Sequence, residues 1–219
     1  MAIPVLIIGK SGSGKSRSMK NCVGKDFALI KVLNKPLPFK GAIPAKCTDN
    51  YDDIMESITK SQSLSVVIDD AGYLITNQFM RQHSTSGKGK AVFDLYNSMG
   101  DNFWNLIMYI ANTLPKNKIV YLIMHETKDD YGEVRPKTIG NLLDTQVCLE
   151  GMFTVVLRCV KEGKEHYFAT QSEDGAVSKA PEEMFDSEKI DNDLLMVDNT
   201  IREYYGIENP KNKEKQEEN

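Results

Sequence analysis

The sequence predicts an α/β protein whose mostly parallel sheet carries helices on both faces. Three short apolar runs, at 4–8, 64–68 and 119–124, are rich in branched residues and are typical of strands buried on both sides. Segments with helical periodicity separate these runs, as the crossover connections of a parallel sheet require. Two further apolar segments, at 152–160 and 166–171, predict an antiparallel hairpin added to that sheet near the C-terminus.

Glycine and proline residues mark most of the expected boundaries between elements. Gly24 ends a short helix that follows a Gly/Ser/Lys turn, and Pro115 ends the longest helix, whose apolar residues keep a clear helical period. The expected order is a strand at 4–8, a helix at 16–23, a strand at 27–33, a lysine-bearing loop at 34–50, a helix at 51–60, a strand at 64–68, a loop at 77–90, a helix at 91–114, a strand at 119–124, a polar loop at 127–138, the hairpin, and a helix at 193–205.

Length and composition favour one domain. Of the 219 residues, 41% are hydrophobic and 26% are charged, which is close to ordinary globular usage. We expect a domain at 1–206 and a disordered charged tail at 207–219, because the last dozen residues lack any apolar period. Four cysteines without metal-ligand spacing favour reduced thiols in a cytoplasmic protein. The first apolar run is too short for a signal peptide, and no segment approaches the roughly 20 apolar residues of a membrane span.

Charge is divided unevenly along the chain. The net charge is −4, but residues 1–47 carry nine Lys/Arg and one acid, whereas residues 48–219 carry 18 Lys/Arg and 30 acids. An overall basic coat for nucleic acid is therefore excluded, whereas a local basic groove formed by the early lysines is not.

Residues 9–16 read Gly-Lys-Ser-Gly-Ser-Gly-Lys-Ser and match the phosphate-binding pattern G-x-x-x-x-G-K-[ST]. A buried strand enters this loop and a helix leaves it, so backbone amides and the helix N-terminus would surround a β-phosphate. Lys15 would reach the β- and γ-phosphates and the Ser16 hydroxyl would bind Mg²⁺; a glycine-rich turn without a ligand is the alternative. The predicted nucleotide-binding residues are Gly9, Lys10, Ser11, Gly12, Ser13, Gly14, Lys15, Ser16 and Arg17.

Two acids and a histidine at strand ends are candidates to complete this site. Asp69 follows a buried strand and is expected to hold Mg²⁺ through water. Asp70 is the candidate general base, although it is shorter than the more usual Glu and could instead cap a neighbouring element. His125 ends the strand expected beside that of Asp69, where a polar side chain could sense the γ-phosphate or serve structure alone.

The motifs favour ATP over GTP as the nucleotide. GTPases add D-x-x-G and [NT]-K-x-D patterns, which residues 69–72 and 127–130 match in order. His125 and Glu126 separate the second match from the apolar strand, so its Asp is poorly placed to reach a base. A small-molecule kinase is a third option, but such enzymes normally need an Arg-rich lid. Arginines are scarce here: Arg17, Arg81, Arg135, Arg158 and Arg202.

Several segments give the chain a resemblance to a known family. They are 3–16, 35–40, 67–70, 118–121, 137–140, 150–154, 190–193 and 201–205. Through them the chain resembles the small ATP-binding proteins encoded in the recombination and replication regions of phages of Gram-positive bacteria. These are RecA-like, AAA-type P-loop ATPases related to the phage ATPases that act in single-strand annealing.

This resemblance implies a RecA-like core, Mg-ATP hydrolysis to ADP and phosphate, and a role in phage DNA recombination or replication in the host cytoplasm. The chain departs from the RecA pattern in one place. Where RecA proteins keep a catalytic Glu, at the end of the second strand, this chain has residues 31–34 and no acid. That departure leaves Asp70 as the only expected nearby acid and predicts slow hydrolysis.

The resemblance also implies assembly, because RecA-like ATPases work as rings or filaments in which a cation from one subunit reaches the γ-phosphate in the next. Arg135 and Lys137 are the candidates for that cation, and Arg81 is a weaker third. Such a residue would stabilise charge on the transferring phosphoryl group. Ordinary solvated surface charges are the alternative interpretation.

Single-stranded DNA would require a flexible basic groove with some aromatic stacking. Lys88 and Lys90 are the first candidates to contact it, followed by residues of the early loops. Those are Lys31, Lys35, Lys40 and Lys46, with Phe39 as a stacking residue. Solvated lysines without a partner are again the alternative.

Two hypotheses of different classes therefore stand. One is an ATPase whose hydrolysis drives or resets assembly on single-stranded DNA. The other is a nucleotide-gated adaptor or loader for another phage protein, with little turnover.

Overall fold

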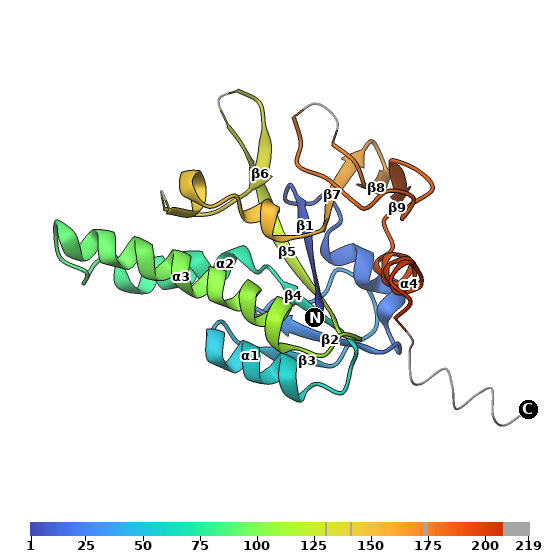
Figure 1. Ribbon diagram of the computed structural model, residues 1–219, viewed down its shortest axis with the longest axis horizontal. Helices are drawn as coiled ribbons and strands as arrows, with labels where there is room; N and C mark the ends of the chain where they lie inside the picture. Colours follow the sequence, from blue (N-terminus) through green and yellow to red (C-terminus); the bar gives the residue numbers. More distant parts are fainter. Residues whose placement is uncertain (130, 141, 173–174, 208–219) are drawn as a thin grey trace, which may run out of the picture.

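The computed structural model describes residues 1–129, 131–140, 142–172 and 175–207 (Figure 1). Within this part of the chain, nine strands form a sheet of order β3-β2-β4-β5-β1-β7-β8-β9, and β6 pairs with β5 outside that path. The strands are β1 (Ile3–Gly9), β2 (Phe27–Lys31), β3 (Ala45–Cys47), β4 (Ser65–Asp69), β5 (Ile119–Lys128), β6 (Val134–Pro136), β7 (Val155–Glu162), β8 (Glu165–Ala169) and β9 (Lys189–Asp191). The helices are α1 (Tyr51–Lys60), α2 (Gly72–Gln82), α3 (Lys90–Thr113) and α4 (Leu194–Tyr204), the 3₁₀ helices η1 (Ser16–Cys22) and η3 (Leu149–Met152), and the π-helix η2 (Leu142–Gln146).

The sheet is mostly parallel, as predicted. Strands β3, β2, β4, β5, β1 and β7 run parallel to their neighbours. Strands β7, β8 and β9 are antiparallel, which confirms the C-terminal hairpin and adds one strand to it. Because β5 lies between β1 and β4, the carboxyl ends of these three strands meet at one edge of the sheet.

Helices cover both faces of the sheet, and the alternation of side chains along β1 shows why. Leu6 and Ile8 pack into a cluster with the apolar residues of α1, α2 and α3 on one face. Val5 and Ile7 pack with η1 and α4 on the other face. All four side chains are fully buried, so this strand is apolar at every position and reads as a continuous hydrophobic run.

A buried polar network fixes α4 at the amino-terminal edge of the sheet. The Asp198 carboxylate accepts hydrogen bonds from the Ser65 hydroxyl at 2.7 Å and the Tyr121 hydroxyl at 2.8 Å. Arg202 Nε donates to the same carboxylate at 2.8 Å, and a second guanidinium nitrogen donates to Ser65 Oγ at 2.8 Å. The pair is therefore buried with its hydrogen-bonding groups satisfied, which is what a buried ion pair requires.

Several boundaries differ from the sequence prediction. The expected loop at 77–90 is helical through Gln82, because Leu74 and Ile75 give α2 an apolar face on the core. The expected loop at 127–138 is an antiparallel hairpin of β5 and β6, so His125 lies inside a strand rather than at its end. The helix expected at 16–23 is a 3₁₀ helix, and β3 forms within the expected loop at 34–50. Residues 208–219 of the predicted tail lie outside the described residues.

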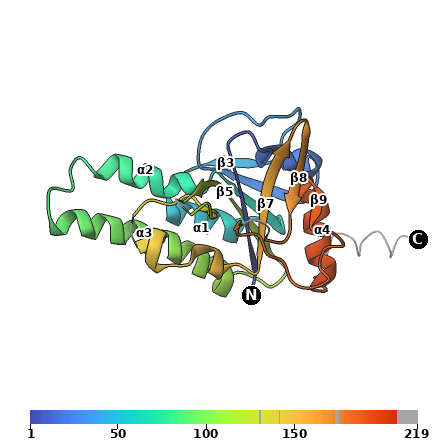
Figure 2. The same ribbon diagram turned by 90° about the horizontal axis from the view of Figure 1, so that it is seen from above.

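Helices α2 and α3 run side by side and project beyond the sheet as a helical arm (Figures 1 and 2). The segment that joins them, 83–89, forms the far end of this arm. Phe93 and Met80 near that end are 70% and 60% exposed. No helix within the described ranges has the length and apolar character needed to cross a bilayer.

Candidate functional site

The phosphate-binding loop runs from the end of β1 to the start of η1, at the carboxyl edge of the parallel strands. Gly12 and Gly14 have φ angles of +77° and +108°, in the left-handed region where a side chain is strained. A Cβ on Gly9 would lie 2.6 Å from the Cys159 carbonyl oxygen. These positions therefore need glycine, and the loop borders a cavity of about 400 Å³.

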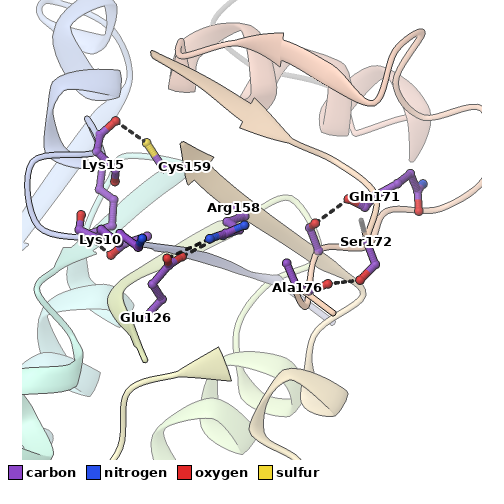
Figure 3. Close-up of polar contacts among 11 residues, drawn as sticks. Lys10, Lys15, Glu126, Arg158, Cys159, Gln171, Ser172 and Ala176 are labelled. Atoms are coloured by element: carbon purple, nitrogen blue, oxygen red, sulfur yellow. Dashed lines mark hydrogen bonds and ion pairs between the residues drawn. The ribbon is translucent and has the colours of Figure 1, made fainter. Parts of the chain in front are cut away.

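The Lys15 side chain is folded against its own loop. Its Nζ donates to the carbonyl oxygens of Gly9 and Lys10, both at 2.8 Å, and Figure 3 shows Lys15 beside Lys10. Burial lowers the pKa of the Lys15 amine. Two neutral carbonyls are weaker partners for an ammonium than an anionic oxygen, so a phosphate entering the cavity would draw Lys15 toward it.

Ser16 and Asp69 form a pair of oxygen ligands at the base of the same cavity. The Ser16 hydroxyl lies 3.0 and 3.1 Å from the two carboxylate oxygens of Asp69. Burial, with the neighbouring Asp70 charge, raises the pKa of Asp69. Among the described residues no group of three His, Cys, Asp or Glu could hold a metal. One carboxylate and one hydroxyl fit Mg²⁺, which usually takes few protein ligands and completes its shell with water and phosphate.

Asp70 occupies a strained turn between β4 and α2. Its φ of +62° is unusual for a residue other than glycine, although Asp is among the residues that tolerate it. The side chain is 5% exposed and forms an ion pair with the ammonium of Lys35. Strain of this kind persists where the surrounding structure holds a residue in place, and here it directs a carboxylate into the cavity.

His125 faces Asp70 across the cavity. It pairs in register with Gly9, and its Nε2 lies 3.7 Å from Asp70 Oδ1. Burial and the positive charge of Lys15 lower the pKa of His125, so its imidazole is neutral at pH 7. The predicted neighbourhood of Lys15, Asp70 and His125 is therefore present, although His125 sits within β5.

The C-terminal strands hold the phosphate-binding loop from its other side, which the sequence did not predict. The Ser13 carbonyl oxygen lies 3.2 Å from Cys159 Sγ and 2.6 Å from His166 Nδ1. Asn192 donates to Cys159 Sγ at 3.2 Å and accepts from Arg17 at 3.2 Å. No motif marks these residues, because they approach the loop only once β7, β8 and β9 have paired.

Glu126 is a second feature that sequence reasoning missed. It lies beside His125 in β5, is 4% exposed, and accepts two hydrogen bonds from Arg158 at 2.9 and 3.0 Å (Figure 3). Both side chains line a cavity of about 180 Å³ next to the phosphate-binding loop. Asp70 is therefore not the only acid near Lys15, but Glu126 is already paired with a guanidinium.

Other predicted residues are not brought to the cavity. Arg135 pairs with Glu133 on the exposed β5–β6 hairpin, and Arg81 pairs with Asp49. The Lys137 backbone N–H donates to the His125 carbonyl at 2.8 Å, but its side chain does not line the cavity. Lys88 and Lys90 lie at the far end of the helical arm, and Lys40 is exposed on the β2–β3 loop. Lys35, predicted to contact DNA, lies instead in the cavity.

The residues at 127–130 that match the GTPase pattern [NT]-K-x-D begin in strand β5 of the β5–β6 hairpin. Thr127 pairs with Arg135 in the strand ladder. The Asp129 carboxylate accepts from the backbone N–H groups of Tyr131 at 3.0 Å and Glu133 at 2.8 Å. Residue 130 lies outside the described residues. Asp129 stands at the unspecified third position of the motif, and its side chain shapes its own turn, whereas the acid of the motif is Asp130.

Comparisons with known proteins show a distant likeness to solved structures alone. No family model matches the chain, and no curated protein matches it. Among solved structures, the chain is similar to an ATPase from the type III secretion system of pathogenic bacteria, with 11% identity and a TM-score of 0.40. The match covers 73% of this chain and 51% of that one, so the chain spans about half of that ATPase.

Proposed function

We propose that this protein is a P-loop ATPase that binds Mg-ATP. The observation that carries the proposal is the convergence of Lys15, Ser16 and Asp69 on one cavity, from the ends of β1 and β4. A loop with this sequence between a buried strand and a helix is built to bind phosphate through its amides.

Each side chain has a defined task in this proposal. Lys15 leaves its loop carbonyls and binds the β- and γ-phosphate oxygens, while Ser16 and Asp69 hold the Mg²⁺. The bound metal would neutralise charge on the phosphate oxygens. Asp70 accepts a proton from a water molecule whose oxygen attacks the γ-phosphorus. The bond from that phosphorus to the β–γ bridging oxygen breaks, and ADP leaves with the electron pair.

ATP is the favoured nucleotide. Thr127, the first residue of the guanine-type motif, supports this preference, because it pairs with Arg135 in the β5–β6 ladder, beyond His125 and Glu126. A competition experiment with equal ATP and GTP tests it. Tenfold or greater preference for GTP would overturn the assignment of ATP.

We further propose that the ATPase acts with single-stranded DNA in phage recombination or replication. The helical arm supports this, because Lys88 and Lys90 lie near an exposed aromatic side chain, Phe93. Basic groups with exposed aromatic rings are the usual means of following a single strand. A ring or filament would place many helical arms along one DNA strand. It would also bring Arg135 of one subunit near the nucleotide site of the next.

Turnover with and without single-stranded DNA separates the enzyme from the adaptor. We expect phosphate release that single-stranded DNA stimulates, that Lys15→Ala abolishes, and that Lys88→Ala/Lys90→Ala makes insensitive to DNA. The matched control is Lys60→Ala, an exposed lysine on α1 that pairs with Glu56. Tight nucleotide binding without turnover, with or without DNA, would favour the nucleotide-gated adaptor. DNA binding that does not weaken with salt would contradict the role of the lysines.

A further inference from the structure

Besides Lys15 and Arg17, Lys35 brings a further cation to the cavity. Lys35 comes from the loop between β2 and β3, and its ammonium forms an ion pair with Asp70. The Lys35 side chain is 50% exposed, whereas that of Asp70 is 5% exposed. Asp70 is therefore buried in the site, whereas Lys35 reaches Asp70 from a loop that is exposed to solvent.

The backbone of this loop is anchored while the Lys35 side chain remains accessible. Lys31 Nζ donates to the Lys35 carbonyl oxygen at 2.9 Å. Pro36 and Pro38 line the same cavity, and Phe39 packs against the core. Prolines restrict the backbone on either side of each ring, so the loop holds Lys35 Cα at a fixed place beside the cavity.

The charges in the cavity explain why Lys35 can exchange partners. Although burial alone would lower it, the Asp70 carboxylate raises the pKa of Lys35, so the side chain is an ammonium ion. A γ-phosphate carries more negative charge than one carboxylate and offers several oxygens. In the cavity that Lys15, Asp70 and Lys35 share, it would compete directly with Asp70 for the Lys35 ammonium.

We propose that Lys35 supplies, from within the same chain, a second cation that joins Lys15 at the terminal phosphate of a bound nucleoside triphosphate. When the triphosphate enters, the Lys35 ammonium leaves the Asp70 carboxylate and binds a γ-phosphate oxygen. After phosphate departs, Lys35 pairs with Asp70 again. This inference rests on the proposed function of the site. It makes Lys35 both a sensor of triphosphate over diphosphate and a stabiliser of charge on the transferring phosphoryl group.

The exchange differs from the arrangement in which a neighbouring subunit supplies the cation. Arg135 is already paired with Glu133 on an exposed hairpin and would reach a phosphate only in an assembly. Lys35 needs no assembly, because its own chain places it in the cavity. Hydrolysis per subunit is therefore expected to be independent of protein concentration in the absence of DNA.

Affinities for Mg-ATP and Mg-ADP, measured by calorimetry on the full chain, test the proposal. For Lys35→Ala we expect ATP affinity to fall about tenfold while ADP affinity changes less than about twofold, as for the loss of one charged contact. Lys35→Arg should restore most of the ATP affinity. The control is Lys25→Ala, an exposed lysine shortly before β2. Circular dichroism checks that each variant is folded.

A second variant tests the exchange itself. Asp70→Asn removes the competing charge but leaves Lys35 in place, so ATP affinity should rise while single-turnover hydrolysis falls. A role of the ion pair in structure alone would lower or leave unchanged the affinity for both nucleotides.

The outcomes also separate this inference from the proposed function. An unchanged ratio of ATP to ADP affinity in Lys35→Ala would overturn it, as would hydrolysis that rises steeply with protein concentration and disappears in Arg135→Ala. If the wild-type chain binds neither nucleotide, or Lys15→Ala binds as the wild type does, the proposed function fails and this inference fails with it.

Discussion

Two carboxylates and two ammonium groups line one cavity, with a neutral imidazole beside one of the carboxylates. Asp69 and Asp70 oppose Lys15 and Lys35, and His125 lies 3.7 Å from Asp70. Arg17 also lines this cavity, so the described cations around it outnumber the carboxylates by one. A bound triphosphate adds negative charge to the cavity. The side chains that respond most should therefore be those whose present hydrogen-bond or ion-pair partner the phosphate replaces.

His125 should gain a proton when a triphosphate binds at acidic pH. Burial and Lys15 hold its pKa below the usual value, whereas an added anion raises it. Affinity should therefore increase as pH falls from neutral into the acidic range below the ordinary histidine pKa. Because the phosphate also titrates, the measurement is the difference between wild type and His125→Gln.

The control for this experiment is His83→Gln, which removes an exposed histidine of the helical arm. It should keep the wild-type pH dependence. Identical pH profiles for wild type and His125→Gln would show that the His125 imidazole takes up no proton on binding.

At the scale of single elements, strand β5 and helix α1 show how connections position the site. Strand β5 places His125 and Glu126 between the phosphate-binding loop and Asp69 because it pairs with both β1 and β4. At the opposite end of this strand, Lys118 donates to the carbonyl oxygens of Ile58, Ser61 and Ser63 at 2.8–3.1 Å. A buried ammonium thus caps the C-terminus of α1, where carbonyls lack helical partners.

Lys118→Met should lower the free energy of unfolding by about 2 kcal/mol, because it leaves these carbonyls without their charged donor while keeping most of the buried stem. Urea unfolding measures the change. Lys116→Met, at an exposed position two residues earlier, should change it by less than about 0.5 kcal/mol. Equal effects of the two substitutions would contradict the role of Lys118 as a cap.

The sequence predicted best the elements that carry their own local signal. The apolar runs that become β1, β4 and β5, and the glycine pattern of the phosphate-binding loop, specify their structure within a few residues. Strand β9 and the contacts of Cys159 and His166 with Ser13 form only after distant strands pair. Lys35 resembles a solvated loop lysine until β2 pairs with β4 and brings it to Asp70.

At the scale of the whole molecule, the buried polar network that stabilises the fold and the cavity of the candidate site lie at opposite ends of the strands. Ser65 begins β4 and belongs to the buried network of Asp198 and Arg202, whereas Asp69 ends the same strand in the cavity. The lysines of the positively charged N-terminal part of the chain also differ in their positions. Lys15 and Lys35 line the cavity, Lys31 holds the backbone of the Lys35 loop, and Lys25 and Lys40 are exposed on the surface.

Arg202→Met should destabilise the fold without changing the site. Removing one partner of a buried ion pair costs about 3 kcal/mol, because Asp198 keeps its charge in the interior. Urea unfolding should show this loss, while the ATP affinity of the folded variant stays within about twofold of wild type. A large loss of affinity would mean that the two edges of the sheet are coupled.

Equilibrium binding of Mg-ATP to the wild-type chain and to Lys15→Ala tests the central claim most directly. We predict saturable binding of one ATP per chain, and affinity about tenfold to a hundredfold weaker in Lys15→Ala, as expected for losing a buried charged contact. Removal of Mg²⁺ with a chelator should weaken binding to the wild type as well. No binding by the wild type, or equal binding by wild type and Lys15→Ala, would contradict the assignment of this loop as the nucleotide site.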